Sequence, residues 1–235
     1  MNAMTRAGAV LTALALTSCA AMHPAYPPAA GGAAVSGNMS PSDLLAAVQR
    51  DADGIDQATD SAQRTQLLLA ATASAQQCLA QFPGTAACPY AQAQVQGLTA
   101  RARPLEAPAL LKEMLASLTK AEAQDPGLDH AGPARLTAIV LLRAPPWPLG
   151  PGDVDAAVTA AQRAVKREPA YPPNLIALGQ AQAKAVGTAP ARATFAKAQQ
   201  AAQAWTGASS DQPAEVAATR AKWQQQVEQG LHDLQ

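Results

Sequence analysis

The first of the three cysteines in this 235-residue chain, Cys19, follows an apolar run. Its thiol is the reactive group whose chemistry the neighbouring residues indicate most clearly. Arg6 precedes the run, which extends from Ala7 to Leu16, and two small residues separate it from Cys19. A basic residue, an apolar stretch too short to span a bilayer and then small residues are typical of a signal for export. We therefore predict that residues 1–18 form a signal peptide.

The four residues Leu16-Thr17-Ser18-Cys19 resemble a bacterial lipobox. This resemblance implies that the signal is cut before Cys19 and that the cysteine carries lipid on its thiol and its new N-terminus. Several acyl chains on one residue exceed what stable membrane attachment needs. Ala20, rather than an aspartate, follows the cysteine, which implies the periplasmic face of the outer membrane of a Gram-negative bacterium. The alternative is an ordinary cleaved signal with a chance cysteine.

The two remaining cysteines, Cys78 and Cys88, form an even pair in an exported chain. Disulfides persist in oxidising compartments, and the intervening residues read as a helix end, a turn and a helix start. We predict a Cys78–Cys88 disulfide; the alternative is two buried free thiols.

The composition excludes several classes of protein. Lysine plus arginine equals aspartate plus glutamate at 17 each, so the chain has no net charge with which to attract nucleic acid or an anionic membrane surface. No later apolar run reaches the length of a membrane span, the longest being Leu136 to Leu142, so the lipid is the only membrane contact that we predict. Aromatic residues make up only 3%, which favours helices packed through small side chains.

Helical signals divide the chain into a tether and one domain. Residues 19–39 are rich in proline, glycine and alanine and are predicted to be a flexible tether. Ser40 precedes Pro41, and Asp43 follows, as at the start of a helix. No segment alternates with the period of a strand, so residues 40–235 are predicted to form an all-α domain.

Landmarks within the predicted helices recur at the spacing of tetratricopeptide repeats. Ala157 and Ala191 are 34 residues apart, as are Ala164 and Ala198. Cys78, Ala121 and Ala164 recur every 43 residues, and each is followed after five positions by a proline. We predict a tetratricopeptide-like helical-repeat solenoid, closed by a capping helix from about Pro213 to Leu234, with Ser210 or Asp211 as its N-cap.

A more specific pattern spans residues 129–174. It comprises Asp129-His130-Ala131-Gly132-Pro133-Ala134-Arg135, then Arg143-Ala144-Pro145-Pro146-Trp147-Pro148-Leu149-Gly150-Pro151-Gly152-Asp153, then Tyr171-Pro172-Pro173-Asn174. This pattern resembles the T-component family of tripartite ATP-independent periplasmic (TRAP) transporters, and Cys88-Pro89-Tyr90 fits the start of an earlier family helix. The resemblance implies a non-enzymatic, tetratricopeptide-like lipoprotein that docks a periplasmic solute-binding protein and assembles with copies of itself.

The sequence gives no sign of catalysis, of a metal site or of a cofactor. His23, His130 and His232 have no metal-ligand spacing, and neither a phosphate-binding loop nor a nucleophile elbow is present. The candidate partner or ligand surface consists of six residues: Tyr90, Arg135, Arg143, Trp147, Tyr171 and Asn174.

Five of the six candidates have a structural alternative. Trp147 could instead pin its loop to the helices, and the arginines could form salt bridges with Asp129, Asp153 or Glu168. Tyr171 and Asn174 could serve a turn and a helix cap. Besides a transporter accessory, a general scaffold for envelope proteins and a module that binds a small ligand are therefore open as functions.

Overall fold

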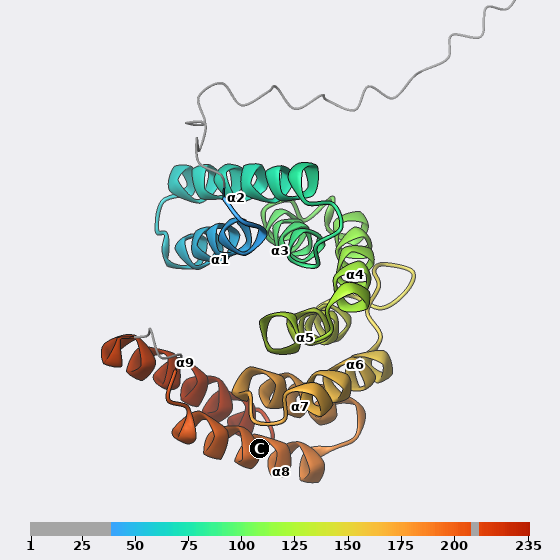
Figure 1. Ribbon diagram of the computed structural model, residues 1–235. Coiled ribbons are helices and arrows are strands. Elements are labelled where there is room, and N and C mark those ends of the chain that lie inside the picture. Colours follow the sequence, from blue (N-terminus) through green and yellow to red (C-terminus); the bar gives the residue numbers. More distant parts are fainter. Residues whose placement is uncertain (1–38, 208–211) are drawn as a thin grey trace, which may run out of the picture. The chain divides into compact units, whose positions relative to one another are not determined.

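The computed structural model describes residues 39–207 and 212–235, and this part of the chain is all-helical (Figure 1). The predicted signal peptide, Cys19 and all but the last residue of the predicted tether lie outside the described residues. Nine helices are described there: α1 (Pro41–Gln57), α2 (Ser61–Gln81), α3 (Ala87–Ala102), α4 (Ala107–Gln124), α5 (Leu128–Arg143), α6 (Val154–Arg167), α7 (Pro172–Ala185), α8 (Thr188–Ala204) and α9 (Pro213–His232). None of them is long and apolar enough to cross a membrane.

Local signals set the helix starts that the sequence predicts most clearly. Ser40 caps α1, its hydroxyl accepts from the Asp43 amide, and the Asp43 carboxylate accepts from the Ser40 amide. Asp153 caps α6 in the same manner, by accepting from the amide of Ala156. For α9, however, the predicted caps at 208–211 lie outside the described residues, and Gln212 is the N-cap. The backbone N–H of Gln212 donates to the Glu215 carboxylate three residues on, as in a capping box.

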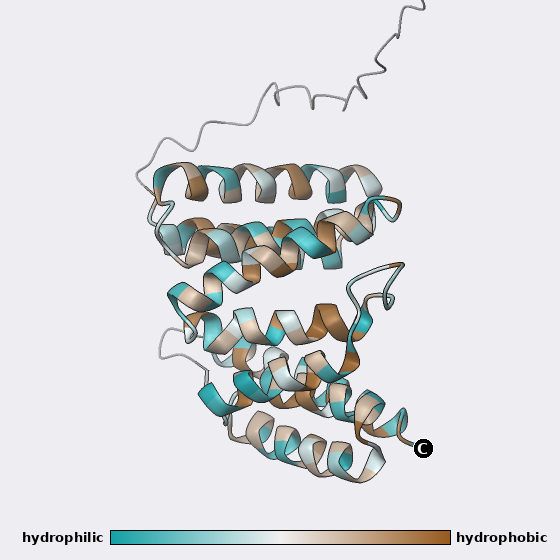
Figure 2. Cartoon of the chain, turned by 90° about the vertical axis from the view of Figure 1, so that its right-hand side faces the viewer, coloured by the Kyte–Doolittle hydropathy of each residue, from teal (hydrophilic) through white to brown (hydrophobic). Residues whose placement is uncertain are grey.

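Successive helices pack against one another through small residues. The four predicted landmarks Cys78, Ala121, Ala164 and Ala198 lie in α2, α4, α6 and α8, and each is fully buried. A small side chain at such a position lets the neighbouring helix approach closely. Figure 2 shows apolar and polar residues interleaved along the helices.

Phe195 anchors the last three helices. Its ring is buried and lies over Gly179 of α7 and Gly230 of α9, where an added Cβ atom would overlap the ring. Glycine at both positions is what allows α7 and α9 to pack on the same aromatic side chain. Through this contact α8 joins a hydrophobic cluster of α7 and α9 residues. The cluster includes Leu175, Ile176, Trp223 and Val227.

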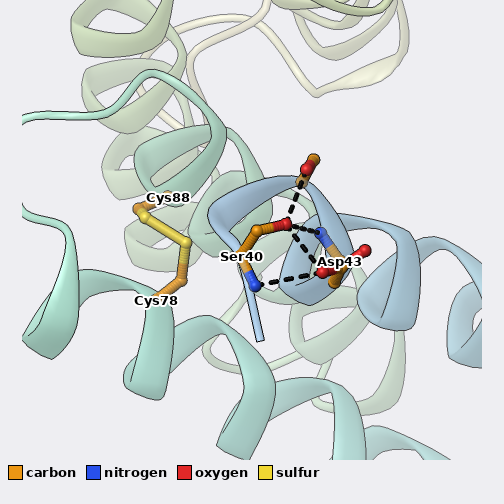
Figure 3. The surroundings of a disulfide bond; sticks show 5 residues. Ser40, Asp43, Cys78 and Cys88 are labelled. Carbon is orange, nitrogen blue, oxygen red and sulfur yellow. Dashed lines mark hydrogen bonds between the residues drawn. A yellow bond between two sulfur atoms is a disulfide. The ribbon is translucent and has the colours of Figure 1, made fainter. Parts of the chain in front are cut away.

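The Cys78–Cys88 pair joins the end of α2 to the start of α3 (Figure 3). Both cysteines are fully buried beside Leu44 of α1, and their Cα atoms are 5.1 Å apart. The bonded pair is therefore the one that the sequence predicts. It ties together the three helices that begin the described domain.

Replacing both cysteines, as Cys78→Ala/Cys88→Ala, should lower the free energy of unfolding by about 2–3 kcal/mol, because the unfolded chain loses a ten-residue cross-link. Urea unfolding with and without a reductant measures the change. The reductant should destabilise the wild-type protein and leave the double variant unchanged. Equal sensitivity of both proteins to the reductant would contradict the bond's contribution.

Candidate functional site

A groove of about 910 Å³ runs along the inner faces of α1, α3, α4, α5, α7 and α9. Aliphatic side chains and one thioether form much of its lining, among them Leu98, Leu111, Met114, Leu136, Ile139 and Ile176. Its volume lies within the usual range for pockets that bind small molecules. The groove is therefore large and apolar enough to hold a ligand or an extended segment of a partner.

Four basic and two acidic side chains also line the groove, so positive charges outnumber negative charges in the lining. Arg135 pairs with Asp129 at 2.9 Å, Lys222 approaches Asp53 at 4.0 Å, and Arg101 pairs at 2.7 Å with Asp56 outside the lining. Arg143, the last residue of α5, has no hydrogen-bond or ion-pair partner in the part of the chain that the structure describes. The groove thus contains one positive charge without a counter-ion.

A buried polar network forms the wall of the groove between α3, α5 and α7. One Asp129 carboxylate oxygen, Oδ2, accepts a hydrogen bond from the Tyr90 hydroxyl at 2.6 Å and one from Arg135 Nη2 at 2.9 Å. Arg135 Nη1 donates to Asn174 Oδ1 at 3.0 Å. Tyr90, Arg135 and Asn174 are only 1%, 8% and 0% exposed, so the network holds its members in fixed positions.

The same network supports an unusual backbone. Asp129, His130 and Ala131 have φ values of 50°, 52° and 62°, which places three consecutive non-glycine residues in the left-handed region. This conformation costs roughly 1–2 kcal/mol per residue. Arg135 Nη1 donates to the carbonyls of Asp129 and His130, and Asn174 Nδ2 donates to that of His130. Side chains outside the turn therefore stabilise its strained backbone. Strained backbone held by its surroundings is common at functional sites.

The phenols in this wall are held neutral. Burial raises the pKa of Tyr90 well above its usual value, and the Asp129 carboxylate raises it further while Arg135 opposes the shift. Burial also raises the pKa of Tyr171, again against the effect of Arg135. Tyr90 consequently remains a hydrogen-bond donor to Asp129 through the physiological range of pH.

An aromatic cluster continues the wall toward α9. His130 stacks on Tyr171 with ring centroids 4.2 Å apart, and Trp205 and Trp223 contact Tyr171 edge-on at 5.6 and 5.8 Å. The Arg135 guanidinium carbon lies 5.2 Å from the Tyr171 ring centroid, a cation–π contact. Tyr171 and Trp223 both line the groove.

The structure brings together five of the six candidate residues. Tyr90, Arg135, Arg143 and Tyr171 line the groove, and Asn174 lies directly behind Arg135. Asn174 is fully buried, so its place on an exposed partner surface is wrong. Its amide instead donates to the carbonyls of Ala164 and Glu168 at the end of α6.

Trp147 is the exception among the candidates. It lies in the loop between α5 and α6, is 86% exposed and does not line the groove. The alternative in which Trp147 pins the loop to the helices is therefore excluded. The salt bridge predicted as the alternative for Arg135 is present with Asp129, whereas Arg143 forms none in the described region.

Sequence reasoning did not include Asp129, His130 or Trp223 among the site residues. Asp129 and His130 occur in the pattern of residues 129–174, and Asp129 is also a possible salt-bridge partner, but neither is a candidate site residue there. No local pattern marks them, because they meet the other residues through tertiary packing. Among the described residues, no cluster of three or more histidine, cysteine, aspartate or glutamate side chains is arranged to hold a metal ion.

No protein-family model matches the chain, and no curated protein matches it at a significant level.

Gly132→Ala should destabilise the protein by about 1–3 kcal/mol, the usual cost of overpacking a core. The new methyl group would overlap the Tyr90 hydroxyl oxygen and lie 2.7 Å from Asp129 Oδ2, and would therefore force the network apart. Thermal and urea unfolding measure the loss. Gly84→Ala is the matched control, because no atom lies within 4 Å of its added Cβ, and it should change stability by less than about 0.5 kcal/mol. Equal stability of the two variants would contradict the role assigned to the network.

Proposed function

We propose that this chain is a non-enzymatic binding protein with a tetratricopeptide-like repeat fold, anchored through Cys19 at the periplasmic face of the outer membrane. In this proposal it acts as a T-component-like accessory subunit and binds a periplasmic solute-binding protein. The buried small residues at the repeat landmarks of α2, α4, α6 and α8 support the repeat fold. The sequence pattern of residues 129–174 supports the family role.

The observation that carries the binding role is the groove with Arg143 in its lining. Apolar side chains favour a ligand with hydrophobic surface, and an unpartnered guanidinium favours a carboxylate. The other cations in the lining have carboxylate partners, so Arg143 is the charge that a ligand would neutralise. The ligand that fits is therefore a carboxylate attached to an apolar chain. Either an acidic segment of a partner protein or a free small acid has this chemistry.

Calorimetric titration with octanoate and with octanamide tests this chemistry. The wild-type protein should bind octanoate more tightly than the neutral amide, and Arg143→Gln should weaken octanoate binding by roughly tenfold or more, the loss of a charge-assisted hydrogen bond. Arg192→Gln is the control, because Arg192 lies on α8 outside the groove lining. If octanoate does not bind, or binds both variants equally, the small-acid arm of the proposal is wrong.

The protein-partner arm needs a separate measurement. A photo-reactive side chain in place of Gln226, which lines the groove from α9, should cross-link to a solute-binding protein in intact envelopes. The same replacement at Lys197, exposed on α8, should not. Cross-links to a solute-binding protein from both positions, or from neither, would contradict docking in the groove.

The anchor predicts that Cys19→Ser abolishes labelling by a fatty-acid analogue and releases the protein from the membrane fraction or leaves its signal uncut. Leu16-Thr17-Ser18-Cys19 is the basis for this expectation, because the resemblance to a lipobox assigns the lipid to Cys19. Metabolic labelling and membrane fractionation provide the readout. Unchanged labelling in the variant would show that the lipid is elsewhere.

A further inference from the structure

Exposed apolar side chains gather on three of the connections between helices. Leu105 is 100% exposed on the α3–α4 turn, Trp147 and Leu149 are 86% and 70% exposed on the α5–α6 loop, and Val186 is 61% exposed where α7 ends. Among the described residues, one other large hydrophobic side chain is exposed, Leu69 on α2, at 40%. Such a concentration of exposed hydrophobic residues on loop tips indicates contact with something apolar.

The three connections lie along one edge of the domain. Helices α5 and α7 run parallel, because Arg135 contacts Asn174 near their beginnings and Lys184 Nζ donates to the Leu142 carbonyl at their ends. Helices α3 and α5 are joined at their beginnings by the bond from Tyr90 to Asp129. The last turns of α3 and α5 then line the same groove, and Figure 2 shows the connections after them on the same side of the helices. We call these three connections the apolar edge.

The α5–α6 loop pairs most of its backbone N–H groups within the chain. Of its ten residues, 144–153, four are prolines and have no N–H group. Five of the other six N–H groups donate within the chain: those of Ala144, Leu149, Gly150, Gly152 and Asp153. Unpaired N–H groups and unpaired carbonyls both oppose burial of a loop in an apolar medium. This loop has few unpaired N–H groups but many carbonyls that accept no bond within the described residues, which suits the hydrated interface of a bilayer and not its hydrocarbon interior.

Basic residues stand one turn behind the apolar tips. Arg101, Arg143 and Lys184 occupy the last turns of α3, α5 and α7. Arg101 is paired with Asp56 and Lys184 donates to the Leu142 carbonyl, so Arg143 is the one of the three without a partner among the described residues. A long basic side chain behind an apolar tip can reach the phosphates of a bilayer while the tip enters the interface. Tryptophan is enriched at this depth of the membrane, since its ring is apolar and its N–H is polar.

We propose that the apolar edge rests on a phospholipid bilayer, with Leu105, Trp147, Leu149 and Val186 inserted at the interface. The tips sit on three separate connections, an arrangement that a fluid lipid surface accommodates without a matching shape. A protein interface would instead concentrate its apolar contacts in one central cluster. The proposal concerns the same anchored protein as the proposed function, but it adds a second membrane contact and the orientation that this contact imposes.

The test uses the mature protein with vesicles of phosphatidylethanolamine containing a minority of phosphatidylglycerol. A photo-reactive phenylalanine analogue replaces Trp147, Leu105 or, as the control, Leu69. Lipid adducts are expected at positions 147 and 105 and not at position 69. No lipid adduct at 147, or equal adducts at 147 and 69, would overturn the proposal, as would cross-links from 147 to protein alone in intact envelopes.

Flotation of the vesicles and the mass of the N-terminal peptide report on the Cys19 anchor in the same samples. If the lipidated protein floats with the vesicles but forms no lipid adduct at position 147, the proposed membrane contact of the apolar edge is wrong and the Cys19 anchor is supported. An adduct at position 147 from protein without lipid on Cys19 supports the edge and refutes the anchor. Trp147→Ser/Leu149→Ser should lose the adduct at position 105, while its melting temperature should stay unchanged because both side chains are exposed.

Discussion

The described domain depends on the partly buried ion pair between Arg135 and Asp129. Removing water from two charges is unfavourable, and such a pair persists only where further hydrogen bonds satisfy both partners. The Tyr90 hydroxyl donates a hydrogen bond to the Asp129 carboxylate. The Arg135 guanidinium donates to the Asn174 side chain and to the carbonyl of His130. The bonds cross from α3 to α5 and from α5 to α7, so they connect the first half of the described helices to the second. Loss of any one partner would leave a buried charge or donor unsatisfied, which is why this network fixes the arrangement rather than merely adding to its stability.

The geometry of the groove and of the apolar edge both follow from that connection. With the beginnings of α3, α5 and α7 held together, their inner faces form one wall and their ends point to one side. Small buried residues elsewhere let the helices approach closely. They do not determine which positions of two neighbouring helices meet, because one alanine contact is much like the next along a helix. The polar network determines those positions and with them the relative orientation of the helices. An alanine-rich core therefore packs the helices, and a few hydrogen-bonded side chains determine where they meet.

Features encoded by neighbouring residues could be predicted from the sequence, whereas features made by distant residues could not. The start of α1 was predicted because Ser40 is a short polar cap beside its own helix. The Cys78–Cys88 pair was predicted because only a turn separates its members. The left-handed turn at 129–131 has no such signal, since Asn174 stabilises it from more than 40 positions away. For the same reason the sequence grouped the right residues around Arg135 but assigned to a surface some that are buried.

Arg143 belongs to both the groove and the apolar edge, because it lines the cavity and is the last residue before the proline-rich loop. A second hollow of about 590 Å³ beside it is also lined by Lys184 at the end of α7. A change at Arg143 would therefore alter the charge available to a ligand in the groove and to a phosphate at the edge together. Gln226 lines the groove far along the chain from the exposed tips, whereas Trp147 is outside the lining. The two proposed roles can consequently be separated at these positions, and a protein whose apolar edge rests on lipid would still present its groove to the proposed partner.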